Sequence, residues 1–378
     1  MKRAIVLGGG MVGSAMARDL AADPELEVTV ADVRPEALKH LRERYGLRTV
    51  QADLSDPAEV KRVIADHDLV LGGLASTIAL QALRVVIESK KNYVDIAFMA
   101  EDATQLDGLA KEHGVTAVVD CGVAPGISNM IAGWGAKNFD PCRRIEILVG
   151  GLPVIRRWPY DYKAPFAPHD VIEEYTRPAR IVERGQIVVK EALSEPELLD
   201  FPGVGTLEAF NTDGLRSLAY TLKVPDMRER TMRYPGHIAL MRAMRDTGLF
   251  SKEPITVAGG TVRPLDVTAA LLFPKWTFDE READLTVMRV SVEGRHEGVD
   301  TRIVWDLLDH YDPVADMRSM SRTTAFPATI MARMIARGRF VRPGVHPPEV
   351  PGAEPGLLDE MLHELQARGV RYDKRVER

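Results

Sequence analysis

A short run of glycines near the amino terminus has the spacing of a phosphate-binding turn. The residues from Gly8 to Gly13 read GGGMVG and fit the pattern G-x-G-x-x-G directly after an apolar, strand-like segment. Gly8 would allow a sharp turn, Gly10 would leave room for a pyrophosphate against the backbone, and Gly13 would let a helix pack closely on the strand. Met11 and Val12 would begin that helix, whose free N–H groups attract phosphate. The run therefore predicts a dinucleotide site.

An acidic residue at the end of the next predicted strand bears on which dinucleotide binds. Asp32 would accept hydrogen bonds from both ribose hydroxyls and repel a 2′-phosphate, which favours NAD over NADP. Arg34 would soften this preference by pairing with a phosphate. Alternatively, Asp32 caps the helix that starts at Pro35. After the third predicted strand, Asp53 and Leu54 would meet the adenine edge, unless Asp53 is only a turn residue.

Small residues follow the fourth predicted strand and would line the same cofactor. Gly73 ends that segment, and Ala75 and Ser76 begin the next helix. In an open parallel sheet, ligands bind outside the carboxyl ends of the strands. Small side chains at this point would leave space for the middle of the dinucleotide.

The segment VVDCGVAPGISN, at 118–129, leaves the sixth predicted strand through two glycines and a proline. Gly122 and Gly126 would let the backbone pass close to a flat ring, and Pro125 would stiffen the corner, so the nicotinamide is predicted to lie along it. Cys121 and Gly122 would also face the substrate. Cys121 is interpreted as a small packing residue rather than a nucleophile. The alternative is an ordinary turn between domains.

Strand-like and helix-like segments alternate through residues 1–121, as in the doubly wound parallel sheet of the Rossmann fold. Residues 122–321 contain more strands and fewer helices, among them an apolar run at 217–224 interpreted as a strand. They predict a mixed α+β domain for substrate binding and oligomerisation. The fold class is therefore α/β with a second α+β domain. In the remainder, 339–378, the five prolines and three glycines of 343–356 predict no regular element before a final helix and a charged tail.

The composition excludes several classes of function. The 378 residues carry a net charge of −6, which argues against a nucleic-acid partner. No apolar run approaches the roughly 20 residues of a membrane span. The two cysteines, Cys121 and Cys142, form no paired motif, which indicates a reduced, cytoplasmic protein. No metal site is predicted.

Several segments occur in the order found in a known family. The chain reads DCGVAPGISNMIAG at 120–133, VGGLP at 149–153, DVIEEYTRPARIVERG at 170–185, LEAFNTDGL at 207–215, MRYPGHIALMRAM at 232–244 and SRTTAFPATIMARMIARG at 321–338. Together with the glycine motif these resemble the saccharopine dehydrogenase family, and most closely the branch that contains L-lysine 6-dehydrogenase. The resemblance implies that the helix at 322–338 returns to the nucleotide-binding domain. It also implies a homo-oligomer, a dimer or larger.

Polar residues in these segments are candidate ligands for an amino-acid substrate: Arg177, Asn211, Thr212, Asp213 and Arg233. The planar fork of an arginine suits a carboxylate, and Asp213 would hold an ammonium group. His237 or Tyr162 would serve as a base near neutral pKa. The alternatives are structural: Arg177 would pair with Glu173 or Glu174, and His237 would pack or cap a helix.

These features predict NAD-dependent oxidative deamination of the side-chain amine of a basic amino acid. Hydride would pass to the nicotinamide, and water would hydrolyse the resulting imine. The first alternative is a saccharopine dehydrogenase or reductase, whose additional substrate carboxylates would need further arginines, such as Arg156, Arg157, Arg216, Arg228 and Arg230. The others are a carboxynorspermidine-type dehydrogenase and a non-catalytic NAD-binding protein that responds to redox state.

Overall fold

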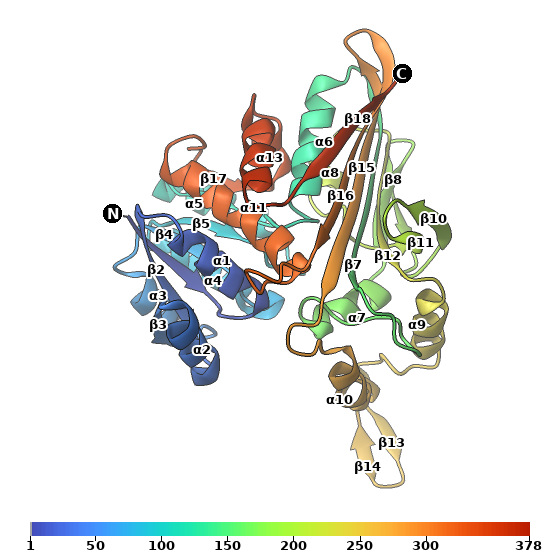
Figure 1. Cartoon of the computed structure of the whole chain (residues 1–378), viewed down its shortest axis with the longest axis horizontal. Coiled ribbons are helices and arrows are strands. Elements are labelled where there is room, and N and C mark those ends of the chain that lie inside the picture. The colour runs from blue at the N-terminus through green and yellow to red at the C-terminus, as the bar shows by residue number, and fades with distance from the viewer. Residues whose placement is uncertain (1) are drawn as a thin grey trace. The chain divides into compact units, whose positions relative to one another are not determined.

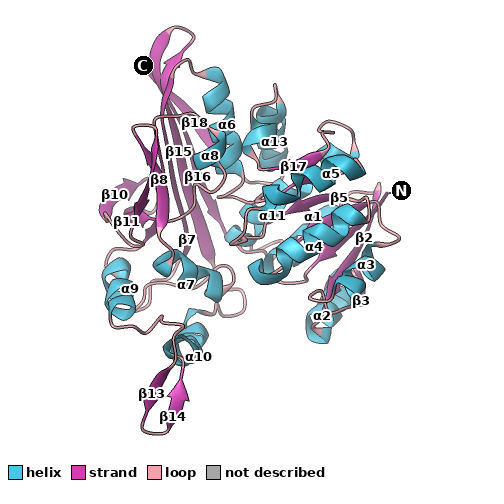
Figure 2. Cartoon of the chain, turned by 180° about the vertical axis from the view of Figure 1, so that it is seen from behind, coloured by secondary structure: helices cyan, strands magenta, loops and turns pink. Residues whose placement is uncertain are grey.

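The structure, a computed structural model, describes residues 2–378. The chain forms two compact units. Unit 1 contains the chain up to Lys137 together with Ser321–Arg371, and unit 2 contains Asn138–Met320 and Tyr372–Arg378. Each unit has its own sheet (Figures 1 and 2).

Unit 1 is built on a seven-stranded parallel sheet with the order β17-β6-β5-β4-β1-β2-β3. Its strands are β1 (Lys2–Leu7), β2 (Leu26–Asp32), β3 (Arg48–Gln51), β4 (Leu69–Gly72), β5 (Asn92–Asp95), β6 (Thr116–Val118) and β17 (Gly344–His346). The order reverses direction between β1 and β4, which creates the crevice where dinucleotides bind in this fold. The predicted Rossmann domain is confirmed.

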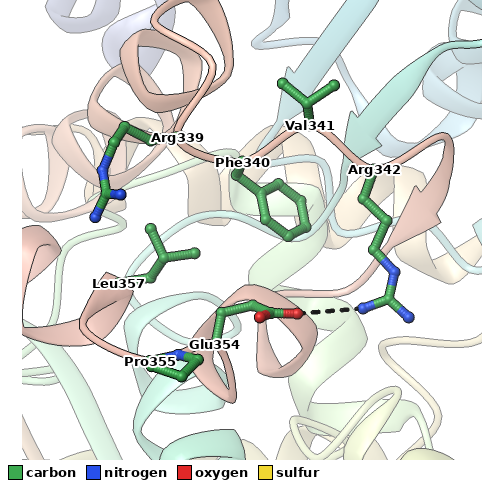
Figure 3. A pocket seen from close by; sticks show the side chains of 7 residues that line it. All are labelled: Arg339, Phe340, Val341, Arg342, Glu354, Pro355 and Leu357. Carbon is green, nitrogen blue, oxygen red and sulfur yellow. Dashed lines mark hydrogen bonds and ion pairs between the residues drawn. The ribbon is translucent and has the colours of Figure 1, made fainter.

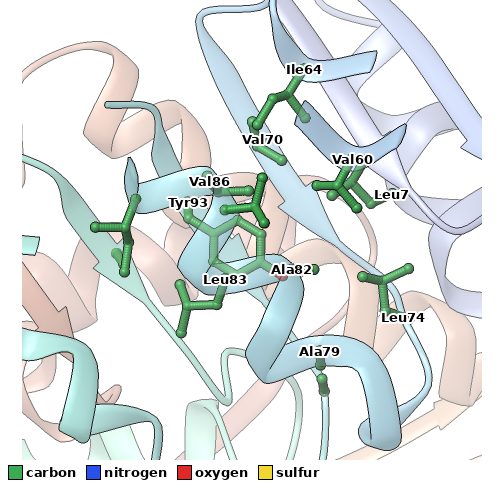
Figure 4. Packing of buried hydrophobic residues seen from close by; sticks show 14 of the residues in the cluster. Leu7, Val60, Ile64, Val70, Leu74, Ala79, Ala82, Leu83, Val86 and Tyr93 are labelled. Atoms are coloured by element: carbon green, nitrogen blue, oxygen red, sulfur yellow. The ribbon is translucent and has the colours of Figure 1, made fainter. Parts of the chain in front are cut away.

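Helices follow the strands of unit 1 in the alternating order that a parallel sheet requires (Figure 1). They are α1 (Met11–Ala21), α2 (Pro35–Tyr45), α3 (Pro57–Ile64), α4 (Ser76–Glu88), α5 (Asp107–His113) and α6 (Ile127–Asn138), with the 3₁₀ turn η1 (Ala103–Leu106), and later α11 (Ser319–Ala336), α12 (Glu349–Gly352) and α13 (Leu357–Ala367). Figure 4 shows part of the core between the sheet and its helices, where Leu83 and Val86 of α4 pack near Val70 and Tyr93.

Unit 2 contains a nine-stranded mixed sheet whose main path is β10-β11-β12-β7-β15-β16-β18. Its strands are β7 (Cys142–Pro153), β8 (Ala179–Glu183), β9 (Gln186–Lys190), β10 (Glu197–Phe201), β11 (Gly205–Asn211), β12 (Asp226–Arg233), β15 (Asp284–His296), β16 (Val299–His310) and β18 (Tyr372–Glu377). Only β12 and β7 pair in parallel, and the other ladders are antiparallel. The predicted mixed domain is confirmed.

Unit 2 contains fewer helices than strands, as predicted (Figure 2). They are α7 (Pro168–Thr176), α8 (Leu218–Thr221), α9 (His237–Asp246) and α10 (Pro264–Trp276), and a small hairpin pairs β13 (Ile255–Val257) with β14 (Gly260–Val262). A core of mostly aromatic and long apolar side chains, among them Tyr162, Tyr175, Phe210 and Trp276, lies among α7, α9 and α10.

Two local predictions are wrong. The proline-rich segment contains β17 and the short helix α12, and the strand fits because Pro343 and Pro347 flank its three residues instead of occupying them. The apolar run at 217–224 forms the short helix α8 rather than a strand, since so short an apolar run fits either period. The charged tail also adopts structure, because β18 completes the edge of the unit 2 sheet against β16.

Candidate active site

The glycine turn connects β1 to α1, and the three glycines of the motif differ in what surrounds them. Gly8 has a φ of +99°, and a Cβ there would lie 2.4 Å from the carbonyl oxygen of Gly73. A Cβ on Gly13 would lie 1.9 Å from the Gly8 carbonyl oxygen. At Gly10, by contrast, the nearest atom would be Nη2 of Arg34, 3.7 Å away. Gly8 and Gly13 are therefore fixed by backbone packing, whereas Gly10 borders open space.

That open space lies at the amino end of α1. Gly10 is the N-cap residue and no side chain accepts a hydrogen bond from the first turn, which Met11 and Val12 begin. The free N–H groups and the positive end of the helix dipole suit a pyrophosphate. The turn therefore fits the dinucleotide that the sequence predicts there, with Gly10 as the part of the cradle that a side chain would fill.

Asp32, at the end of β2, holds the glycine turn in place. Its carboxylate accepts hydrogen bonds from the backbone N–H groups of Gly9 (2.7 Å) and Arg34 (2.8 Å), and it pairs with the Arg34 guanidinium at 3.0 Å. Burial alone would raise the pKa of Asp32, but these hydrogen bonds outweigh burial and hold it below its usual value. The N-cap of α2 is Arg34 and not Asp32, and no side chain caps it.

Asp32→Ala should change the preference between cofactors. The substitution removes the negative charge at the predicted ribose site and frees Arg34 to pair with a 2′-phosphate, so the ratio of NADP to NAD affinity should rise by about tenfold or more. Fluorescence titration of both reduced cofactors would measure the ratio. A wild-type protein that already binds NADP more tightly would show that Arg34 controls the pocket.

The other predicted cofactor residues lie at or just beyond the carboxyl ends of β3 and β4. Asp53 is exposed and accepts hydrogen bonds from Ser55 N (3.0 Å) and Oγ (2.6 Å), the geometry of a turn residue. Its neighbour Leu54 is buried. Ala75 is the N-cap of α4, without a side-chain cap, and Ser76 is the first helical residue. Contact with the adenine edge remains a prediction for Asp53.

The corner at 120–126 is tightly folded within unit 1. Gly126 has a φ of +142°, and a Cβ there would lie 1.8 Å from the Gly122 carbonyl oxygen. A Cβ on Gly122 would lie 3.1 Å from Cγ2 of Thr324 and 3.2 Å from the Pro125 carbonyl oxygen. Cys121 is fully buried, and burial raises its thiol pKa, with smaller effects from the charges of Asp95 and Asp120. The thiol is therefore held in its inert, protonated form.

Gly122→Ala should reduce amine turnover by about tenfold or more while cofactor affinity falls only slightly. If the nicotinamide lies along this corner, an added methyl group hinders the approach to the near-attack distance of roughly 3–3.5 Å. The methyl group would also press on Thr324. Thr324→Ser removes the opposing methyl group and keeps the hydroxyl. The double variant Gly122→Ala with Thr324→Ser should therefore recover thermal stability but not turnover. Recovery of both would mean that the corner only links two elements.

In unit 2, the structure brings Tyr162, Arg233 and His237 together. Arg233 ends β12 and is 2 % exposed. Its guanidinium lies 4.6 Å from the centre of the Tyr162 ring and forms an ion pair with Glu174 at 2.6 Å. The rings of Tyr162 and His237 are 4.9 Å apart. A buried guanidinium beside aromatic rings can bind a carboxylate strongly, because little water competes for it.

The hydrogen bonds of His237 determine which nitrogen carries its proton. Nδ1 lies 2.8 Å from the Tyr160 carbonyl oxygen, which can only accept, so Nδ1 donates. Nε2 therefore accepts from the Tyr175 hydroxyl, 2.9 Å away, and that hydroxyl in turn accepts from Nε of Arg233 at 3.2 Å. Burial, and then the charge of Arg233, lowers the His237 pKa to about 3, so the ring is neutral.

The two candidate bases, Tyr162 and His237, are therefore both uncharged near neutral pH. Burial raises the pKa of Tyr162 well above its usual value, and both ring nitrogens of His237 have partners. Glu174, Tyr175 and Trp276 complete this cluster. The sequence did not single out Tyr175 or Trp276, and it indicated Glu174 only as a candidate partner of Arg177, whereas Glu174 pairs with Arg233. Glu174 and Tyr175 lie inside the segment at 170–185. Nε1 of Trp276 is buried without a hydrogen-bond partner, so it remains available as a donor.

The remaining predicted substrate residues have partners within unit 2. Asp213 is buried and pairs with Arg180 at 2.6 Å, and Arg177 pairs with Glu173 at 3.5 Å. Thr212 donates to Glu229 at 2.5 Å. Asn211 donates to Ser194 and Glu195, and its side-chain oxygen is buried without a partner.

Burial raises the pKa of Glu229 to about 8, and the charges of Glu174 and Asp213 add to this effect.

A separate pocket of about 270 Å³ lies in unit 1 near Phe340 and Leu357 (Figure 3). Its two arginines already have partners: Arg342 lies 3.4 Å from Glu354, and Arg339 lies 2.7 Å from Glu360. The pocket precedes β17, so it lies at the amino edge of the parallel sheet, opposite the edge where the dinucleotide is predicted to bind.

Among the described residues 2–378, no group of three or more His, Cys, Asp or Glu residues is arranged to hold a metal ion. Within the same residues, no helix combines the length and the apolar character that crossing a membrane requires.

Comparison with known families accounts for both units. A family model described as "Saccharopine dehydrogenase NADP binding domain" matches residues 4–118, and one described as "Saccharopine dehydrogenase C-terminal domain" matches residues 122–370. The chain belongs to the saccharopine dehydrogenase family. The family resemblance seen in the sequence is thus confirmed, and the matched domain supports a nicotinamide cofactor without deciding between NAD and NADP.

Individual relatives of this family are distant but cover the chain. The Saccharomyces cerevisiae saccharopine dehydrogenase [NADP(+), L-glutamate-forming] is 21% identical over 95% of this chain and 96% of its own length. Carboxynorspermidine synthase of Vibrio cholerae is 23% identical over 93% and 92%. The bovine mitochondrial alpha-aminoadipic semialdehyde synthase is 20% identical over 98% of this chain, which spans only 47% of that protein.

A solved structure confirms the fold. The apo saccharopine dehydrogenase (L-Glu forming) of Saccharomyces cerevisiae superposes with a TM-score of 0.82 and 18% identity, and each chain covers the other completely (100% and 100%). The relatives are oxidoreductases and synthases of amino-acid and amine metabolism by name. None of those described above is a lysine 6-dehydrogenase.

Proposed function

We propose that this protein oxidises the side-chain amine of a basic amino acid with a nicotinamide dinucleotide, as L-lysine 6-dehydrogenase does. When bound, the nicotinamide would accept the hydride from the carbon that carries the amine. An ammonium group has no lone pair, so the bound nitrogen would first lose one proton to solvent. Its lone pair would then form the C=N bond as the hydride leaves, and water would convert the imine to an aldehyde and ammonia. NAD is the proposed oxidant, because Asp32 is ionised and faces the predicted ribose site.

The pairing of the arginines in unit 2 is the reason for proposing lysine rather than saccharopine as the substrate. Saccharopine bears two more carboxylates than lysine, and each would need a cationic partner. In unit 2, four of the five arginines that would supply these partners are already paired with carboxylates of the chain: Arg156 with Asp161 (2.7 Å), Arg157 with Asp279 (3.4 Å), Arg228 with Glu146 (2.6 Å) and Arg230 with Glu197 (2.7 Å). Arg233 is the arginine that is buried among aromatic rings, and one such arginine matches one α-carboxylate.

The residues of the chain would bind and orient rather than react. Arg233 would bind the α-carboxylate in exchange for part of its contact with Glu174. The rings of Tyr162 and Trp276, 5.2 Å apart, offer an apolar surface to an alkyl chain and exclude water. The turn at Gly10 would bind the pyrophosphate and so fix the nicotinamide end of the cofactor.

Saccharopine dehydrogenation is the second candidate. It is favoured by the similarity of the whole chain to the yeast enzyme, which covers 95% of this sequence. For either reaction we also propose a homo-oligomer, which light scattering would measure directly.

The experiment follows the absorbance of reduced nicotinamide while L-lysine, L-ornithine, saccharopine or carboxynorspermidine is offered with NAD or NADP. We expect the highest kcat/KM for a basic amino acid with NAD, and release of ammonia in equal amount. Turnover of saccharopine alone, with formation of glutamate, would establish the second candidate. Cofactor binding without oxidation of any amine would refute both.

A further inference from the structure

Two carboxyl groups that the proposed function does not use lie at the ends of neighbouring strands in unit 1. Asp95 is the last residue of β5, and Asp120 follows the end of β6. The Asp120 N–H donates to Oδ1 of Asp95 at 3.2 Å, and the next residue, Cys121, donates its N–H to the Asp95 carbonyl oxygen at 2.7 Å. Asp120 has a φ of +54°, so its backbone is held in the left-handed region.

Unsatisfied polar atoms surround this pair. Asp95 is fully buried, and its Oδ2 has no hydrogen-bond partner. Tyr93 is also fully buried, and its hydroxyl faces the Asp95 carboxyl without forming a hydrogen bond of good geometry. Both residues lie against Gly72, because a Cβ there would be 2.0 Å from the Tyr93 hydroxyl and 2.9 Å from Cβ of Asp95. Buried polar atoms without partners are rare, and they mark a place where a ligand can complete the hydrogen bonding.

The charge state of the pair follows from its surroundings. Burial, and then the charge of Asp120, raises the pKa of Asp95 to about 8, against the opposing effects of hydrogen bonds from the backbone and of the Tyr93 hydroxyl. The titratable groups facing Asp95 are Tyr93 on its own strand, and Asp120 and Cys121 after β6. Burial and the nearby carboxylates raise the pKa values of Tyr93 and Cys121, so both stay protonated. Near neutral pH, Asp95 therefore carries a proton.

We propose that Asp120 and Asp95 form the subsite for the cationic nitrogen of the amine substrate, and that Asp95 releases a proton when the cation binds. The more accessible Asp120 receives the nitrogen, and the fully buried Asp95 ionises behind it. The positive charge of the substrate ammonium replaces that of the Asp95 proton. The Asp95 O–H bond breaks, its electrons stay on the carboxylate, and the proton passes to the buffer. The ligand class is a primary or secondary ammonium. This inference rests on the proposed function for the identity of the substrate only.

The location agrees with the chemistry required. The carboxyl ends of β5 and β6 adjoin the corner that is predicted to lie along the nicotinamide, and ligands of such sheets bind at this edge. Asp213, which the sequence analysis predicted to hold an ammonium group, is already paired with Arg180. Asp95 and Asp120 lie at the edge of the sheet where the cofactor is predicted to bind, so they would place the nitrogen beside the oxidant.

Calorimetry in buffers of different ionisation enthalpy would count the released protons. NADH-loaded protein, which cannot oxidise an amine, is titrated with L-lysine or saccharopine at about pH 7, and about one proton per bound cation should be released. Asp95→Asn keeps the acceptor for Asp120 N–H and mimics the neutral acid, and it should release almost none. Asp66→Asn, an exposed control with the same change of charge, should behave like the wild type.

The outcomes separate this inference from the proposed function. Proton release with saccharopine but not lysine would refute the lysine assignment and leave the subsite intact. Binding with no release, or equal release from Asp95→Asn, would overturn the subsite and leave the reaction untouched. Failure of every amine to bind would overturn both.

A measurement without ligand tests the protonation of Asp95 directly. A carboxyl whose pKa is raised from 3.8 to about 8 on folding contributes stability below the lower value and loses it as pH rises through the higher one. The unfolding free energy of wild type should therefore fall, relative to Asp95→Asn, as pH rises from about 4 to about 8. Parallel pH profiles of the two proteins would mean that Asp95 is ionised throughout.

Discussion

Gly10→Val should bind neither NAD nor NADP, while its circular dichroism and thermal midpoint stay close to those of the wild type. A Cβ at Gly10 meets no atom closer than 3.7 Å, so the apo protein has room for a side chain. The same side chain occupies the space where a pyrophosphate would approach the backbone. We expect cofactor affinity to fall by at least about 100-fold, which corresponds to about 2.8 kcal/mol.

Gly108→Val is the matched control for this result. Gly108 lies in α5 of the same unit, is exposed, and a Cβ there would meet nothing within 4 Å. It should bind both cofactors normally. Normal cofactor affinity in Gly10→Val, measured by titration with NADH and NADPH, would mean that the phosphates bind elsewhere.

Arg233→Met should lower both stability and amine turnover. The substitution leaves Glu174 without its cation, and breaking a buried pair in this way costs on the order of 3 kcal/mol of unfolding free energy. If Arg233 binds the substrate carboxylate, kcat/KM should also fall by more than about 100-fold, because a charge-assisted bidentate contact is lost.

A second substitution separates these two effects. Arg233→Met with Glu174→Gln removes both charges and should recover most of the stability, but none of the turnover. Recovery of turnover as well would show that Arg233 acts only by neutralising Glu174. Arg263→Met breaks an exposed pair with Asp266 and should leave both quantities unchanged. Urea unfolding and steady-state kinetics provide the two readouts.

The sequence predicted the parts of the fold that depend on local signals. The helix α2 begins at Pro35 and is followed by Gly46 with a φ of +66°, as a proline at the first position and a glycine after the last one indicate. The glycine turn is recognised from an equally local signal, the spacing of its glycines directly after a strand, and contacts with nearby backbone require Gly8 and Gly13. The strand β17 was not predicted, because a strand of three residues is stabilised by its pairing with β6, and no local sequence pattern indicates that pairing.

The candidate site was predictable only in part, for the same reason. Arg233, His237 and Tyr162 were found as polar residues in shared segments, and the structure brings them together. Their roles depend on burial and on partners such as Glu174 and Tyr175, and spacing along the chain contains neither. Asp95 was not predicted as a site residue, because an aspartate at the end of a strand is common. Only the buried Oδ2 without a hydrogen-bond partner distinguishes it from other such aspartates.

The discontinuous composition of unit 1 has a consequence for how the protein is made. The strand that completes its sheet, β17, is encoded after the whole central part of unit 2, so a nascent chain leaving the ribosome exposes the free edge of β6 until Gly344–His346 emerge. At typical rates of translation this interval lasts on the order of ten seconds or more. An uncovered strand edge is a template for association with other chains. Expression yield should therefore depend on chaperones that shield this edge, and a fragment that stops before β17 should aggregate even though it contains the complete glycine turn.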